Sequence, residues 1–159
     1  MTDARFEDGA EAPLALLAVT GEDVPVLSAL VQDAVFPATE MRFDRKRRRF
    51  ALLLNRFRWE DRAAAERAKR PYERVQSLLV VGDVTQVATS GITRGDADVI
   101  LSLLSVTFEA GADGAGTLTL TLAGDGAIRL MVDCVDLGLR DVTRPYVAPS
   151  RKAPEHPVD

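Results

Sequence analysis

Cysteine and histidine are nearly absent from this sequence, which contains one of each in 159 residues. The single cysteine, Cys134, has no partner for an internal disulfide, and a zinc site needs several Cys or His ligands. The lone His156 lies in a proline-rich tail, which argues against catalysis that depends on a buried histidine. The composition therefore predicts no metal site and no cofactor, and a reducing compartment is the simplest expectation.

Long apolar runs are also missing. The longest candidate, residues 14–20, is far shorter than the roughly 18 residues that a membrane-spanning helix needs. Four of the first eleven residues are acidic, whereas a secretory signal begins with basic residues and continues with apolar ones. We therefore expect a cytoplasmic protein that does not contact a membrane.

The residues that are present suit one globular domain. Apolar residues make up 47% of the chain and charged residues 28%, which is enough for a core and a soluble surface. We expect residues 1–12 to be a flexible lead-in and residues 13–144 to form a single α+β domain. Residues 145–159 contain four prolines and are predicted to be a flexible tail.

Periodicity predicts mainly strands. Strands are expected at residues 14–19, 72–81, 84–92 and 100–108, and a basic hairpin with arms at 39–44 and 48–59. Residues 93–98 read as a turn, and residues 60–71 as a short exposed helix or a mobile loop. Asp23 and Pro25 predict the start of an amphipathic helix. The clearest pattern is a hairpin at 117–133, where apolar residues alternate on both sides of Gly124-Asp125-Gly126.

The order of these elements predicts an antiparallel sheet of about seven strands that curls into a barrel. One helix precedes it, and a short C-terminal helix is expected to begin at Asp133, with Val135, Leu139 and Val142 on its inner side. The layout is similar to the pleckstrin-homology-like barrel, which is an analogy of fold and carries no function.

Four phrases together resemble a known bacterial family. They are the run from Leu52 to Glu60, which contains Asn-Arg-Phe-Arg-Trp-Glu, then Arg74-Val75-Gln76-Ser77, Leu101-Ser102-Leu103-Leu104 and Gly126-Ala127-Ile128-Arg129-Leu130. These phrases resemble the domain of unknown function number 2948, over residues 14–148. The resemblance implies a small bacterial cytoplasmic protein, and it supplies no activity, cofactor or catalytic residue.

Motifs that carry chemistry are scarce. The sequence has no G-x-G-x-x-G, no G-x-x-x-x-G-K-[ST] and no G-x-S-x-G. Asp133 and Asp136 form the nearest carboxylate pair, which helix capping explains more simply than acid–base catalysis. Cys134 fits a small core residue better than a reactive thiol. We therefore predict no catalytic residue.

The best functional signal is the basic hairpin. Residues 42–74 contain thirteen Lys and Arg against five Asp and Glu, a local charge of +8, whereas the remainder carries −12. Guanidinium groups bind phosphate and carboxylate, and aromatic rings stack on bases. The candidate binding residues are Arg45, Lys46, Arg47, Arg48, Arg56, Arg58 and Trp59.

Three functions remain open from these residues. The main hypothesis is a non-enzymatic binding or scaffold module that contacts an acidic protein surface or RNA through the hairpin. The alternatives are an enzyme with a carboxylate- and arginine-lined pocket for a small anionic metabolite, and a structural homodimer that pairs an exposed strand with its twin. A solvated turn whose arginines pair with the acidic remainder explains the same residues without any function.

Overall fold

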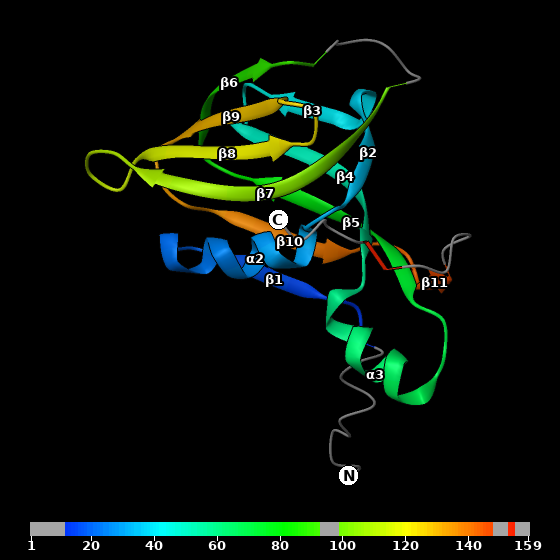
Figure 1. The fold of residues 1–159 in the computed structure, drawn as a ribbon. Helices are drawn as coiled ribbons and strands as arrows, with labels where there is room; N and C mark the ends of the chain where they lie inside the picture. The colour runs from blue at the N-terminus through cyan, green and yellow to red at the C-terminus, as the bar shows by residue number, and fades with distance from the viewer. Residues whose placement is uncertain (1–11, 93–98, 148–152, 155–159) are drawn as a thin grey trace.

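The computed structural model describes residues 12–92, 99–147 and 153–154, and within them the fold is α+β. Two helices, α2 (Val24–Val31) and α3 (Arg62–Ala68), accompany eleven strands (Figure 1). The strands are β1 (Ala15–Ala18), β2 (Val35–Pro37), β3 (Met41–Asp44), β4 (Arg49–Phe57), β5 (Glu73–Val81), β6 (Val84–Ser90), β7 (Ile100–Ala110), β8 (Gly116–Leu122), β9 (Ala127–Val132), β10 (Leu137–Asp141) and β11 (Tyr146–Val147).

All eleven strands belong to one antiparallel sheet. Its order is β1, β10, β5, β4, β2, β7, β8, β9 and β6, while β3 pairs with β4 and β11 pairs with β5 beside this path. The short β2 joins the two halves, because it pairs with β4 through Val35 and with β7 along all three of its residues. Strands β1 and β6 are therefore the two ends of the path.

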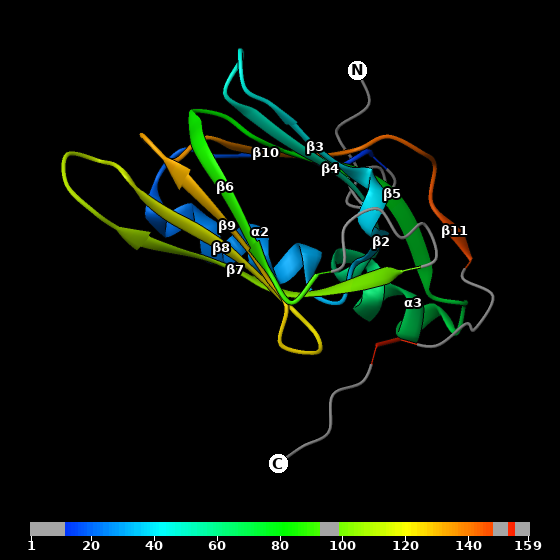
Figure 2. The ribbon, with the colours of Figure 1, turned by 90° about the horizontal axis from the view of Figure 1, so that it is seen from above.

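The core lies between the two halves of the sheet, where α2 is also placed (Figure 2). Leu27 and Val31 on one side of α2 are fully buried, and the helix packs chiefly against β7. Strands β4, β5, β8 and β9 contribute alternate residues to the core, as the pleat of a β-strand requires. The predicted hairpin at 117–133 is confirmed as β8 and β9, with its inner face buried at Leu118, Leu120, Leu122, Ile128, Leu130 and Val132.

Polar residues flank both helices, with Asp23 and Gln32 beside α2 and Asp61 and Lys69 beside α3. The Asp23 carboxylate accepts hydrogen bonds from the backbone N–H groups of Val19 and Thr20, so it fixes the turn just before α2. These bonds lower the pKa of Asp23. Residues 60–71, predicted as a helix or a loop, contain α3, which ends at Lys69 with a left-handed φ of 54°.

The predicted barrel and C-terminal helix are wrong. The sheet is open, and residues after Asp133 form β10, which pairs with β5 and β1. Leu137 and Leu139 are buried two residues apart, whereas Val142, expected on the inner side of a helix, is 46% exposed. A period of two is that of a strand, so the analogy with the pleckstrin-homology-like barrel does not hold.

Several terminal and loop predictions lie outside the described residues. They are the lead-in up to residue 11, the turn at 93–98 and most of the proline-rich tail. At the start of the tail, Tyr146 and Val147 form β11 against Arg74 and Glu73 of β5. Over the part of the chain that is described, no helix combines the length and apolarity needed to cross a membrane.

Candidate binding groove beside the basic hairpin

The basic hairpin forms as predicted, from β3 and β4. Their register pairs Met41 with Leu52 and Asp44 with Arg49, which places the turn at residues 45–48. The Asp44 carboxylate accepts a hydrogen bond from the backbone N–H of Arg47 at 3.1 Å, and Arg48 adopts a positive φ of 53°. This local bond is how Asp favours a turn, and the turn presents all of residues 45–49 to solvent.

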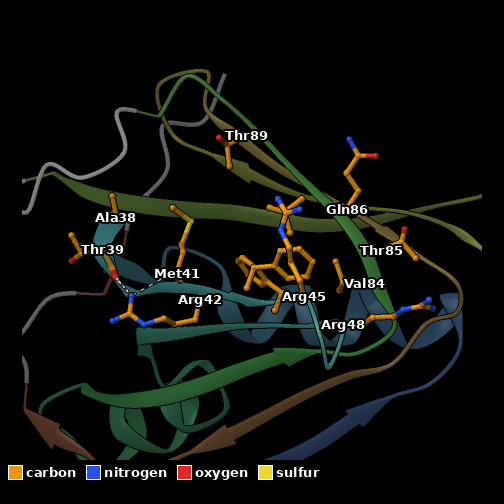
Figure 3. Close-up of a pocket in the computed structure, with 13 residues that line it drawn as sticks. Ala38, Thr39, Met41, Arg42, Arg45, Arg48, Val84, Thr85, Gln86 and Thr89 are labelled. Atoms are coloured by element: carbon orange, nitrogen blue, oxygen red, sulfur yellow. Dashed lines mark hydrogen bonds between the residues drawn. The ribbon is translucent and has the colours of Figure 1, made fainter.

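A groove of about 1180 Å³ opens between this hairpin and β6 (Figure 3). We call it the hairpin groove. The hairpin wall consists of residues from Thr39 to Phe50, and the β6 wall consists of residues from Val84 to Thr89. The two walls meet where the backbone N–H of Val84 donates to the carbonyl of Arg48 at 2.8 Å. Away from this contact, β3 and β6 diverge (Figures 1 and 2).

Among the described residues, the charged residues that line the hairpin groove are all arginines. They are Arg42, Arg45 and Arg48, and no Asp or Glu of the described ranges joins them. Arg42 turns back to donate to the carbonyl of Thr39 at 2.8 Å (Figure 3). Arg48 pairs with Asp133 at 3.2 Å. The Arg48–Asp133 pair is exposed on both sides, so it is weak and exchangeable. The groove therefore has a cationic surface.

The remaining cations of the turn are solvent-exposed. Arg47 lies 3.9 Å from Asp44, again in an exposed pair. Within the described ranges, Arg45, Lys46 and Arg49 have no carboxylate partner within ion-pair distance. The structure thus brings together four of the predicted residues, Arg45, Lys46, Arg47 and Arg48, at one tip.

Arg56 lies elsewhere, at the far end of β4 and inside the protein. Its side chain is fully buried and donates to Glu60 at 2.8 and 2.7 Å and to Asp141 at 2.9 Å. Its Nε also donates to Ser77 Oγ, which donates in turn to Asp141. Burial alone would lower the pKa of Arg56, but Glu60 and Asp141 outweigh it and raise the pKa above its ordinary value. The charge of Arg56 is therefore satisfied internally.

Arg58 is also buried in ion pairs. Arg58 contacts Glu73 at 2.7 Å and Asp61 at 3.7 Å. Arg70 also binds Asp61, to which it donates two hydrogen bonds of 2.6 Å. The bonds from Arg70, opposed by burial, hold the pKa of Asp61 below its ordinary range. We call these residues, together with Arg56, Glu60 and Asp141, the buried ion cluster. It borders a second cavity of about 1060 Å³ beside α3.

Trp59 is not at the hairpin tip either. Its ring packs edge-to-face on Phe57, with centroids 4.6 Å apart, and its indole N–H donates to the carbonyl of Gln32. At the hairpin groove itself Phe50 is buried and Phe43 is half-buried. The aromatic rings near the arginines therefore belong largely to the core.

The acidic and thiol candidates show no catalytic arrangement. Cys134 is exposed, so its expected place in the core is wrong. Its thiol donates to Asp83 at 3.1 Å, and this bond to a carboxylate is the main reason that the pKa of the thiol is raised. A raised pKa disfavours a nucleophilic thiolate. The described residues contain no group of three or more His, Cys, Asp or Glu side chains that could hold a metal ion.

Sequence reasoning missed the second wall of the groove. The sequence predicts a strand at residues 84–92, but the position of this strand opposite the hairpin depends on the pairing of β6 with β9, about forty residues further along the chain. The burial of Arg56 did have a signal, because Arg56 continues the alternation of Phe50, Leu52 and Leu54 on the inner face. Two carboxylates account for the charge there, the nearby Glu60 and the distant Asp141.

These features define a class of protein: an α+β domain with an open antiparallel sheet and a cationic groove beside one end strand. The family model for proteins of unknown function DUF2948 matches residues 14–156, so the chain belongs to that family. No curated protein and no solved structure matches the chain.

Proposed function

We propose that this protein is a non-enzymatic binding module that holds an anionic partner in the hairpin groove. The observation that carries the proposal is the lining of the groove, whose described residues include three arginines and no carboxylate. In a protein whose net charge is −4, such a surface concentrates the positive potential in one concave place. The partner is an acidic protein segment or RNA, and its charges replace water around the arginines.

The state of the individual arginines supports this assignment. Arg45 and Lys46 are exposed without a carboxylate partner in the part of the chain described. Arg48 would have to break only its solvent-exposed ion pair with Asp133 to bind a partner. Binding an anion there costs little of the existing electrostatic stabilisation. Arg56 and Arg58, by contrast, are committed to the buried ion cluster, so the proposal assigns them a structural role.

The enzyme alternative would use the second cavity, since arginines and carboxylates gather there. Its carboxylates are each held by arginines, however, with Asp61 bonded to Arg70 and Asp141 bonded to Arg56. A general acid or base needs a pKa near the working pH, whereas the pKa of Asp61 is lowered from its ordinary value. This arrangement favours a stabilising role for the second cavity and leaves the hairpin groove as the better binding site.

The test compares two variants of equal charge in pull-downs from the native host. In the hairpin variant, Arg45, Arg47 and Arg48 are replaced with Ser. In the control variant, three exposed cations elsewhere, Lys69, Arg129 and Arg140, are replaced with Ser. We expect the hairpin variant to lose the partners that the wild type and the control retain, and the wild-type interaction to fade with added salt.

Treatment with nuclease identifies the class of partner. Loss of the captured proteins after nuclease indicates RNA, and their persistence indicates a direct protein contact. Identical profiles for the wild type and the hairpin variant, at both low and moderate salt, would contradict the proposed function.

A further inference from the structure

Among the described residues, no strand pairs with the edge of β6 that faces the groove. Strand β6 is the last strand of the sheet path, and among the described residues only β9 pairs with it. An edge strand presents a row of backbone N–H and C=O groups that can pair with another chain, and proteins usually blunt such edges with charges or proline. The sequence of β6, Val-Thr-Gln-Val-Ala-Thr-Ser, contains neither.

The irregularity of β6 is confined to its beginning. The register with β9 shifts between Val84 and Gln86, next to the contact with Arg48. From Gln86 to Ser90 the pairing with β9 is regular over five residues. This stretch is as long as an average strand, so its outer edge offers a full set of hydrogen-bonding positions to an added strand.

The groove beside this edge has the two kinds of lining that an added strand needs. A strand directs alternate side chains to opposite faces. The hairpin wall supplies the apolar residues Met41, Phe43 and Phe50, to which β6 adds Val87. The same wall supplies the arginines, with Arg42 between Met41 and Phe43 and with Arg45 and Arg48 in the turn. A segment that alternates apolar and acidic residues therefore matches both kinds of lining at once.

We propose that the hairpin groove binds an extended acidic segment of a partner protein, which adds to the free edge of β6 as a further strand. This inference rests on the proposed function and names the partner of the same site. Backbone hydrogen bonds to β6 supply affinity, and alternate side chains supply specificity, as in other cases of strand addition. The acidic side chains pair with Arg45 and Arg48, and the apolar ones cover Phe43 and Val87.

RNA fits this groove less well, because single-stranded RNA is held by exposed aromatic rings on which bases stack. Phe50 is buried, Phe43 is half-buried, and Trp59 lies at the far end of β4 with its indole N–H already bonded. A second copy of this chain would have to supply an acidic alternating strand. The opposite end strand, β1, has the sequence Ala-Leu-Leu-Ala and carries no charge.

The test uses a blocked nine-residue peptide that alternates glutamate and valine, titrated into the full-length protein by calorimetry. Two further peptides have the same side chains, but one is N-methylated at every valine and the other at every glutamate. Successive backbone N–H groups of a strand point to opposite sides, so each peptide loses the donors of one side. We expect the parent peptide to bind, and at least one methylated peptide to bind at least tenfold more weakly.

Amide hydrogen exchange supplies a second readout. The parent peptide is expected to slow the exchange of amides within Gln86–Ser90, and the control variant at Lys69, Arg129 and Arg140 is expected to behave like the wild type. Equal affinities for all three peptides, or no slowing of exchange in β6, would overturn strand addition.

The outcomes separate this inference from the proposed function. If the parent peptide binds and the hairpin variant loses it, but N-methylation has no effect, charge alone holds the peptide and only strand addition fails. If the peptide does not bind while the pull-downs still distinguish the hairpin variant, the acidic strand is rejected and the partner is another anion, RNA included.

Discussion

Replacing Arg56 with Met should destabilise the protein more than the loss of any exposed arginine. The substitution removes the guanidinium but keeps much of the aliphatic volume. The loss of unfolding free energy therefore comes mainly from the carboxylates of Glu60 and Asp141, which lose their cationic partner. Glu60 is partly exposed, with 27% of its side chain accessible, and water can replace its lost donors. The Asp141 side chain is only 4% exposed, so most of the penalty arises there.

The magnitude follows from what Asp141 retains. After the substitution it still accepts from the backbone N–H of Leu14 at 2.9 Å and from Ser77 Oγ at 2.7 Å. Removing one partner of a buried ion pair costs about 3–5 kcal/mol in general. Because these two donors remain, we expect the lower end, about 3 kcal/mol of unfolding free energy.

Urea denaturation followed by the fluorescence of Trp59, the only tryptophan, measures this loss. The control is Arg47→Met, which removes an exposed pair with Asp44 and should change stability by less than about 0.5 kcal/mol. Adding Asp141→Asn to Arg56→Met should cost less than the sum of the two single changes, because the residues interact directly. A loss below about 1 kcal/mol for Arg56→Met would refute the structural role given to the buried ion cluster.

Three further predictions concern stability. Replacing Leu120, fully buried between β7 and β9, with Ala should cost roughly 2–5 kcal/mol in chemical denaturation, and a cost below half a kcal/mol would reject the assigned face. Arg70 lowers the pKa of Asp61 in the folded protein. The contribution of ionised Asp61 to the free energy of unfolding is therefore complete above the unfolded pKa of about 3.9, and it is lost as the pH falls through the folded pKa. Asp61→Asn should therefore flatten stability below about pH 4, and an unchanged acid profile would argue against this linkage. A protein that ends at Ala148 should keep its melting temperature within a few degrees, whereas a large drop would mean that the tail is docked.

Much of the sheet is predictable from local pattern alone. In β8 each Leu alternates with Thr, and in β9 Ile128, Leu130 and Val132 alternate with Arg129 and Met131. The turn between them contains Gly124, whose positive φ of 79° suits glycine. The same logic placed β4, β5 and β7. In β4 and β5 the buried residues alternate along the strand, so the sequence period and the buried pattern coincide. In β7 the buried Leu103 and Val106 are three residues apart, because the register with β8 shifts between Leu103 and Ser105.

The C-terminal part of the domain was mispredicted because its stabilising contacts are not local. Asp133 resembles a helix cap, but β10 has its partners in β1 and β5, which lie about sixty to one hundred and twenty residues earlier. Asp141 at the end of β10 reaches Arg56 across the same distance in sequence. Propensity over five residues does not outweigh such pairing.

The sequence predicts only one of the two walls of the candidate site. The contiguous cations at residues 45–49 indicated a basic surface, and the structure places them together on one turn. Arg56, Arg58 and Trp59 follow soon after in sequence, yet they lie along a nine-residue strand and beyond it, away from the tip. The groove required a second wall, β6, whose position is set by pairing with β9 and not by any motif.

Site-specific photo-crosslinking in cells of the native host tests the central claim most directly. A benzophenone amino acid is placed at Gln86, which lines the hairpin groove, or at Arg140, which is exposed on β10 outside it. If the groove holds the partner, ultraviolet light will produce a covalent adduct from Gln86, and the Ser variant of Arg45, Arg47 and Arg48 will abolish it. Adducts from Arg140 alone, or from neither position, would contradict the assignment of the hairpin groove as the binding site.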